Sequence, residues 1–359
     1  MAHISPSAAV QTATIAALVK EQTDCIFTES PIFALIQKKG KVKYNCGGYT
    51  TWWNVRYKRR SIRPAGDPLT LDFPQTNTKK RCEVPYRAYE LGESVSKFAQ
   101  LASKNDPNSF YDILGDAISE TMEDFRVDLA SKWVTDGAAT GSTELHGIES
   151  IFNASAVAAN ARVGTPTGTY AGLNTALAAY GGSWTAEDSE AWPTGDGDDQ
   201  YSFFSPLEVD CTNTKWTATT KTWPNTWQEA INWGLTFQET LHGKKSDLIA
   251  LTPLRLLQAK QSLDSSQRFE VMQNKTLIEL GIDSLSYDGV DFMADKTIAA
   301  GTGYGLRFDK IRLHVMGKKL VEMDEDFELV GKKKRMGLDS HLQLIWESPC
   351  FQIKFHDIT

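Results

Sequence analysis

The sequence predicts a mixed α+β protein organised around one long helix. Three observations indicate this class: residues 106–136 carry a helical pattern, residues 47–63 alternate as a strand does, and residues 276–358 hold short strand-like runs separated by Gly and Asp. With 359 residues, 41% of them apolar and 10% aromatic, the chain can bury a substantial core in one to three domains.

The long helix is predicted over residues 106–136. Asp106 is a good N-cap, Pro107 suits the first helical position, and Gly137 stops the pattern. At helical rise this segment forms a rod of roughly 45 Å. A buried stripe is predicted from the apolar residues that recur every three or four positions: Phe110, Ile113, Leu114, Ala117, Ile118, Phe125, Leu129 and Trp133.

The other face of this helix is acidic, whereas the segment before it is basic. Residues 106–136 hold eight acidic and two basic residues, a balance of −6, and residues 41–81 hold ten basic and two acidic residues, a balance of +8. Simple solvation is the ordinary interpretation of either run. Their opposition favours recognition between copies, because electrostatic complementarity sets register and specificity. The candidate contact residues are Arg56, Lys58, Arg59, Arg60, Arg63, Lys79 and Lys80 on the basic side, and Asp116, Glu120, Glu123, Asp124 and Asp128 on the acidic side.

A hairpin is predicted from two alternating segments. Residues 47–63 place Trp53 on one face and Trp52 on the other, and residues 81–89 alternate in the same way. The intervening residues are rich in turn formers, so we expect the hairpin to project from the body. Pro85 lacks a backbone donor and indicates a free edge. Because an isolated hairpin has little stability of its own, a projecting one is expected to be received by a partner.

The remaining chain divides by composition. Residues 24–44 form an arm that holds an apolar cluster opened by Pro31, and this arm is interpreted either as an ordinary domain start or as a strap on a neighbouring molecule. Residues 138–222 are rich in Ala, Gly, Thr and Ser and predict irregular β structure. The further predictions are helices at 8–20, 224–242 and 253–263, strands at 147–152, 203–209 and 247–252, and a solvated turn at 332–335.

No catalytic constellation is found in the sequence. The six histidines lack metalloprotease spacing, and there is no nucleophile elbow, P-loop or dinucleotide fingerprint. Residues 196–199 resemble part of a calcium loop without its closing Glu, so a solvated loop is the better interpretation, and neither a metal nor another cofactor is expected. One alternative function is a carbohydrate-active hydrolase that uses Trp184, Trp192 and nearby carboxylates.

The charge and cysteine content indicate the compartment. A net charge of −7 argues against a protein that coats nucleic acid. Five scattered cysteines without a C-x-x-C pair favour a reduced cytosolic environment. We expect neither a targeting segment nor a membrane span, because no apolar run approaches the ~20 residues that a span requires.

The order of these parts resembles the major capsid proteins of tailed bacteriophages, which have the Hong Kong 97 capsid fold. Residues 145–152 (LHGIESIF) look like the family's G-I-(D/E) stretch, and residues 171–184 resemble a Gly-Asn-Trp segment that some members carry. The axial-domain run of the family is similar to residues 247–252, 281–282, 287–290, 295 and 304–306.

The resemblance implies five parts: an N-terminal arm (1–45), an extended β-hairpin loop (46–90), a spine helix and peripheral domain (91–245), an axial domain (246–316) and a return to the peripheral domain (317–359). It implies a non-enzymatic subunit that self-assembles into hexamers and pentamers of an icosahedral head in the host bacterial cytoplasm and becomes part of the virion. The implied partners are a separate scaffolding protein, a portal, a possible decoration protein and enclosed double-stranded DNA, with no membrane. An encapsulin-like shell that houses a cargo enzyme is a further alternative.

Overall fold

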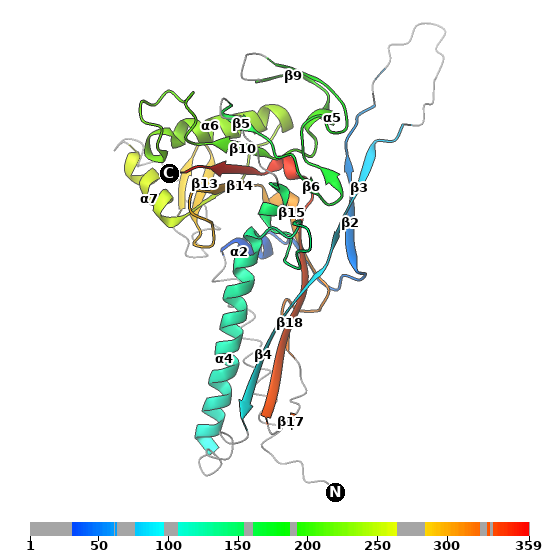
Figure 1. Ribbon diagram of the computed structural model, residues 1–359, viewed down its shortest axis with the longest axis vertical. Coiled ribbons are helices and arrows are strands. Elements are labelled where there is room, and N and C mark those ends of the chain that lie inside the picture. The colour runs from blue at the N-terminus through cyan, green and yellow to red at the C-terminus, as the bar shows by residue number, and fades with distance from the viewer. Residues whose placement is uncertain are drawn as a thin grey trace.

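The computed structural model describes residues 31–60, 62, 76–96, 107–153, 161–186, 192–263, 284–323, 329–330 and 333–358. A rounded part holds most of the strands and short helices, and a long stem of one helix and two strands extends from it (Figure 1). In the part of the chain that the structure describes, no helix is both long enough and apolar enough to cross a bilayer.

The stem consists of helix α4 (Pro107–Ser131) beside two long strands, β4 (Arg87–Ser96) and β18 (Lys333–Trp346). The helix continues as a 3-10 turn, η1 (Lys132–Val134). Phe125, Leu129 and Trp133 are buried, as the apolar stripe predicts. The predicted helix is therefore confirmed, although its regular part ends at Ser131 rather than at Asp136.

Strand β18 is the backbone of a six-stranded sheet. Its first ten residues pair antiparallel with β4, and its last five pair antiparallel with β15 (Ile311–Val315). Three two-residue strands complete the sheet: β1 (Val42–Lys43), β16 (Glu322–Met323) and β17 (Leu329–Val330). The predicted turn at 332–335 is wrong for Lys333–Arg335, because β4 gives this charged segment a complete partner strand.

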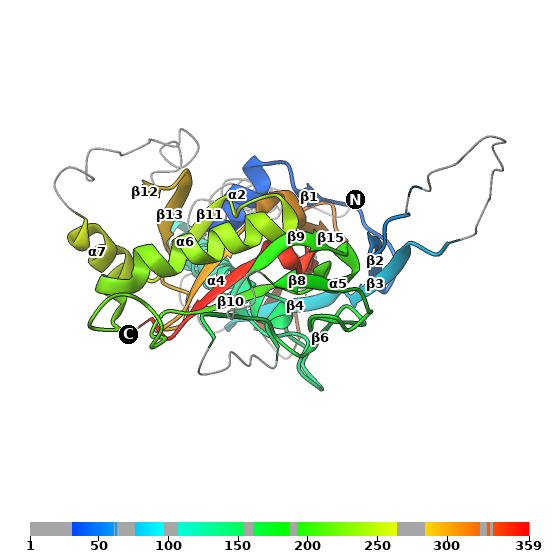
Figure 2. The ribbon, with the colours of Figure 1, turned by 90° about the horizontal axis from the view of Figure 1, so that it is seen from above.

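A seven-stranded sheet forms the centre of the rounded part. Two helices lie beside it, α6 (Trp223–His242) and α7 (Pro253–Ser262), whose positions agree with the sequence pattern (Figure 2). Gly234 permits the close approach of α6, because a Cβ there would meet Val209 at 3.1 Å and Phe355 at 3.3 Å. The strand order is β12 (Ser284–Tyr287), β13 (Val290–Ala294), β11 (Leu248–Leu251), β14 (Gly303–Leu306), β19 (Ile353–His356), β10 (Leu207–Asp210) and β5 (Val163–Gly164).

Three two-stranded sheets lie outside these two. The hairpin consists of β2 (Thr50–Arg56) and β3 (Lys79–Pro85). Its second strand starts two residues earlier than predicted and ends at Pro85 rather than at residue 89. Residues 87–89 belong to β4 instead. The other pairs are β6 (Thr169–Tyr170) with β7 (Leu173–Asn174), and β8 (Trp184–Ala186) with β9 (Pro193–Gly197).

Short helices occupy several connections. The strand predicted at 147–152 is wrong: its centre is a 3-10 turn, η2 (Ile148–Ile151), whose apolar residues are buried without strand pairing. Asp199–Ser202 forms α5 after the acidic loop. Two more 3-10 turns precede β15 and β19, η4 (Phe308–Lys310) and η5 (Pro349–Phe351).

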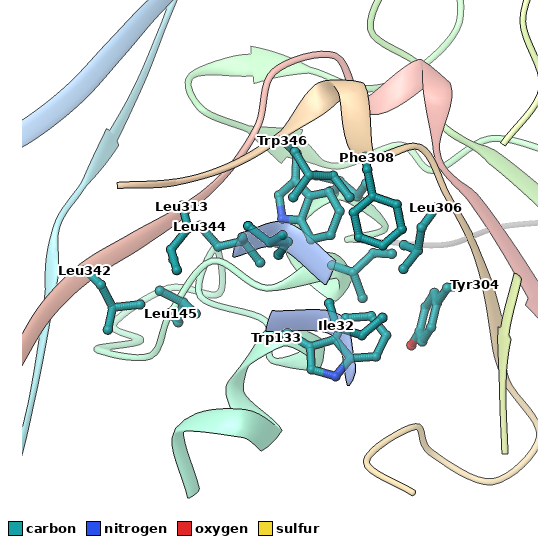
Figure 3. Close-up of a cluster of buried hydrophobic side chains, with 14 of the residues drawn as sticks. Ile32, Trp133, Leu145, Tyr304, Leu306, Phe308, Leu313, Leu342, Leu344 and Trp346 are labelled. Atoms are coloured by element: carbon teal, nitrogen blue, oxygen red, sulfur yellow. The ribbon is translucent and has the colours of Figure 1, made fainter. Parts of the chain in front are cut away.

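The main core lies where the stem meets the rounded part. Trp133 of the turn η1 packs edge-on against Tyr304, with ring centroids 5.7 Å apart, and its indole N–H donates to Thr297 Oγ1 at 2.9 Å. Trp346 and Leu344 of β18 lie in the same cluster (Figure 3).

Helix α2 (Pro31–Lys38) also contributes to this core. Ile32, Leu35 and Ile36 are buried against their own chain. For the described part of the arm, residues 31–44, the structure therefore favours the domain-start interpretation over the strap, while residues 24–30 and the predicted helix at 8–20 lie outside the described residues.

The five-part division remains a prediction. The seven-stranded sheet contains strands from more than one of the predicted parts. Strand β19 of the predicted return segment 317–359 lies between β14 and β10, and β11 of the predicted axial segment belongs to the same sheet.

Candidate assembly surface

The hairpin β2–β3 has one buried and one exposed face. On the inner face, Val55, Cys82 and Val84 are buried in the main core. Thr51 Oγ1 lies 3.0 Å from His314 Nδ1, and the Trp53 indole N–H donates to the Glu347 carbonyl at 3.0 Å. The base of the hairpin is thus anchored on its own chain, and most of the turn-rich tip, which is expected to project, lies outside the described residues.

The predicted cations divide between these two faces. Lys80 points inward, where its ammonium lies over the rings of Tyr57 and Tyr180 at 5.2 and 5.1 Å. Arg59 pairs with Asp199 of the same chain. The cations on the exposed surface are Arg56, Lys58, Arg59, Arg60 and Lys79; Arg59 is exposed despite its ion pair, and Arg63 lies outside the described residues.

Arg56 and Lys79 are directly opposite each other in the antiparallel ladder, on the outer face. Like charges at such a position are destabilising. Among the described residues neither side chain forms an ion pair; Arg56 Nε donates only to the Lys58 carbonyl, at 3.4 Å. This arrangement leaves a positive surface that its own strands do not neutralise.

Two residues of the outer face were absent from the predicted contact set. Trp52 is 58% exposed, and the Arg81 guanidinium stacks over its ring at 5.2 Å. Arg81 also pairs with Glu83 at 3.1 Å. The alternation of residues 47–63 does place Trp52 on the polar face, so a large aromatic side chain at a polar position was the available signal.

The acidic face of α4 is exposed as predicted. Glu120, Glu123, Asp124 and Asp128 are exposed, whereas Thr121, Met122, Phe125 and Arg126 are buried. Glu123 pairs with Arg126 at 3.6 Å. Among the described residues the other three form no ion pair, and the side chain of Asp116 lies outside that set. Val127, 44% exposed, lies in the middle of this acidic surface.

The two charged surfaces lie far apart within one chain. The hairpin flanks the rounded part, whereas the acidic residues line the stem, and both views separate them (Figures 1 and 2). Among the described residues they cannot therefore neutralise each other in one copy. Their meeting between copies stays a prediction.

Trp184 and Trp192, which the hydrolase alternative requires, pack against other aromatic side chains. Trp184 lies 5.3 Å from Tyr201, and Trp192 meets Trp233 edge-on at 4.9 Å and Phe237 at 5.4 Å. A cavity of about 710 Å³ lies beside the hairpin, but neither tryptophan lines it. Aromatic packing accounts for both indoles without a sugar site.

One group of potential metal ligands is present in the described residues. Asp210, His356 and Asp357 place ligand atoms within 4.8 Å of one another at the ends of β10 and β19. Asp210 Oδ1 already accepts the Thr212 N–H and hydroxyl at 2.8 and 2.9 Å, and Asp357 pairs with His356 at 2.9 Å. These hydrogen bonds explain the position of the three side chains as a structural network, without a metal ion. The calcium-like residues 196–199 instead end β9 and begin α5.

The stem helix, the long β4–β18 ladder, the anchored hairpin and the seven-stranded sheet together define the capsid fold of tailed phages. No family model and no curated protein matches the chain by sequence. By structure it is similar to a chain of the Cyanophage A-1(L) capsid, with 14% identity, 92% of this chain and 93% of that chain covered, and a TM-score of 0.58.

Two further capsids are similar. A chain of the native GTA particle capsid has 10% identity, coverage of 90% of both chains and a TM-score of 0.54. A chain of the Myoviridae phage XM1 capsid has 11% identity, covers 89% of this chain and 90% of that chain, and has a TM-score of 0.50. The shared fold extends over nine-tenths of the chain, and the α+β Hong Kong 97-like fold predicted from the sequence is confirmed.

Proposed function

We propose that this chain is the structural major capsid protein of a tailed phage, which self-assembles into hexamers and pentamers of an icosahedral head. The single observation that supports this most is the capsid fold over nine-tenths of the chain, despite identities of 10–14%. A fold can host several functions, so the surfaces must support the assignment too. They do: two exposed surfaces of opposite charge, too far apart to meet within one chain, suit contacts between copies.

The role is proposed to be non-enzymatic. The tryptophans that would serve a hydrolase are packed together, which removes the specific support for that alternative. The net charge of −7 suits a shell that encloses double-stranded DNA without binding it tightly. The proposed setting is the virion, after assembly in the host cytoplasm with a separate scaffolding protein, a portal and a possible decoration protein.

Expression of the chain, followed by sedimentation and negative-stain electron microscopy, tests this proposal. Closed shells or capsomer rings are expected, and a purely monomeric product with and without a scaffolding partner would refute it. Nuclease-protected DNA inside particles from infected cells distinguishes a phage head from a compartment with a protein cargo.

A further inference from the structure

The 3-10 turn η4 borders two cavities. Asp309 lines a cavity of about 470 Å³ together with Lys39 and Lys245, and Lys310 lines the cavity of about 710 Å³ beside the hairpin. The neighbouring elements α2, β1 and β15 lie together at one side of the molecule (Figure 2). We call the exposed face around this turn the η4 surface; it is formed by residues 39–41, 244–247 and 307–310.

The negative charges of the η4 surface are already matched within the chain. Every carboxylate that lines the two cavities is in an ion pair: Asp199 with Arg59, Asp247 with Arg307, Asp309 with Lys41 and Arg307, and Glu347 with Arg312. Lys245 is likewise engaged, by Asp288 at 2.8 Å.

Three cations remain on this surface without a counter-charge. Among the described residues, Lys39, Lys244 and Lys310 form no ion pair, and Lys39 and Lys244 are exposed. The ammonium groups of Lys39 and Lys310 lie over aromatic rings instead, at 4.5 Å from Phe308 and 5.6 Å from Phe351. One copy of the chain therefore leaves this positive charge unneutralised.

The exposed carboxylate of Asp309 reports the resulting positive potential. Burial raises its pKa, but the charges of Arg307, Lys41 and Lys244 outweigh this effect and hold the pKa below its ordinary value. An anionic group brought to the same place would meet the same attraction.

The chemistry of the free cations suits a chain of phosphates better than one small anion. Both terminal nitrogens of Arg307 are engaged, by Asp247, Asp309 and the Lys245 carbonyl, so no rigid fork is left to hold a single ligand. Lysine ammonium groups on flexible stems remain, and these contact phosphates as point charges without a fixed geometry.

A protein partner matches this surface less well than nucleic acid does. Protein interfaces are usually poor in Lys and have an apolar centre. The exposed large apolar residues of the described chain line neither cavity: they are Tyr49, Trp52, Ile62, Val127, Leu254 and Leu257. Lysines without exposed apolar neighbours are typical of contacts with a nucleic-acid backbone.

We propose that Lys39, Lys244 and Lys310 contact backbone phosphates of the packaged double-stranded DNA, so that the η4 surface faces the inside of the shell. The inference rests on the proposed function and adds to it the surface that meets the DNA and the side of the subunit that faces inward. Because only three cations of each copy take part, the contact is weak and independent of base sequence, which agrees with the net charge of −7.

Lysine acetylation of intact particles tests the site in the assembled protein. DNA-filled particles and the same particles after release of their DNA are treated briefly with a small acetylating reagent, and each lysine is quantified by mass spectrometry. Acetylation of Lys39, Lys244 and Lys310 should be at least threefold slower in the filled particles. Lys318 and Lys319, exposed on the turn beyond the far end of β15, are the internal controls and should react equally in both.

Three results of this footprint would overturn the inference. Equal rates at the three lysines in filled and emptied particles would show that DNA does not cover them. Slow reaction in both would mean that a protein covers the surface instead. Equal slowing at Lys318 and Lys319 would indicate general shielding rather than a site. Absence of any particles would count against the proposed function itself, so the two failures are distinguishable.

A titration of the unassembled chain with a short DNA duplex gives a second, independent test. The variant Lys39→Gln/Lys244→Gln should reduce the slope of log affinity against log salt, between about 50 and 200 mM, by about 1.8, since each lost phosphate contact removes about 0.9. The control Lys318→Gln/Lys319→Gln removes the same charge and should keep the wild-type slope. Equal changes in the two variants, or no binding by the wild type at about 50 mM salt, would contradict the site.

Discussion

Arg56 and Lys79 face each other across the hairpin on its solvent-exposed side. Opposed like charges destabilise an antiparallel pair, and nothing else in the described part of the chain neutralises these two. This destabilising pair is explained if the outer face of the hairpin serves to recognise a partner.

The variant Arg56→Glu should therefore separate stability from assembly. A Glu–Lys pair would replace the Arg–Lys pair, so the free energy of unfolding of the unassembled subunit should stay the same or rise by up to ~1 kcal/mol. Its unfolding temperature should therefore be unchanged or slightly higher. Shell formation should fall because the predicted contact with the acidic face of α4 in a neighbouring copy loses a cation. Thermal unfolding and sedimentation velocity measure the two effects. Shells at wild-type yield would show that Arg56 does not contribute to the contact.

The tip of the hairpin should be dispensable for folding. The Tyr57 N–H donates to the Thr78 carbonyl at 3.1 Å, and the buried residues of the hairpin all lie on the body side of this bond. Replacing residues 61–75 by a short Gly-rich turn should leave the circular dichroism spectrum and unfolding temperature almost unchanged. A deletion of residues 61–80 would also remove two residues of β3 and should be more damaging. An unfolded 61–75 variant would contradict the account of the hairpin.

The ion pair between Glu149 and Lys354 should be important for stability. Lys354 Nζ lies 2.6 Å from Glu149 Oε2, the Tyr304 hydroxyl donates to the other oxygen, and the ammonium side chain is 12% exposed. Glu149→Ala would leave a nearly buried charge without its partner and should cost about 3–5 kcal/mol. The double variant Glu149→Gln/Lys354→Met removes both charges and should cost less. Urea unfolding of the unassembled subunit measures both, and equal losses would argue against a charge effect.

Stability should fall on mild acidification. Burial lowers the pKa of His146 to about 4, and also lowers the pKa values of His242 and His314 to about 4. Unfolded histidines titrate near 6.5, so between these values the unfolded chain binds more protons. The histidine contribution is therefore fully present above about pH 7 and is progressively lost between pH 6.5 and 4.

The variant His146→Phe isolates one of these groups. The ring packs against Tyr170, and neither ring nitrogen has a hydrogen-bond partner among the described residues. Urea midpoints at pH 7.5 and pH 5 should differ less in this variant than in the wild type. An unchanged difference would mean that His146 is not protonated on unfolding in this range.

Periodicity predicted the elements whose local pattern and tertiary environment agree. Helix α6 is an example: Thr222 precedes it, Pro224 lies in its first turn, and Gly243 follows it with a left-handed φ of 69°. The strand β11 is another, since four apolar residues in a row indicate burial on both faces.

The failures occur where a distant segment determines the structure. Lys333–Arg335 look like a solvated turn, yet β4, about 240 residues earlier, pairs with them throughout. Likewise, no local signal reveals that Lys80 lies over Tyr180 or that Arg59 meets Asp199. Charge balance identified the two candidate surfaces, but the sorting of residues into inner and outer faces required the tertiary structure.

A cryo-electron microscopy reconstruction of particles formed by the wild-type chain tests the central claim most directly. The account predicts closed shells of hexamers and pentamers, in which the outer face of β2–β3 lies against the acidic face of α4 of a neighbouring copy. Particles in which this face of α4 meets only solvent would contradict the predicted contact, and a chain that remains monomeric would contradict the proposed function.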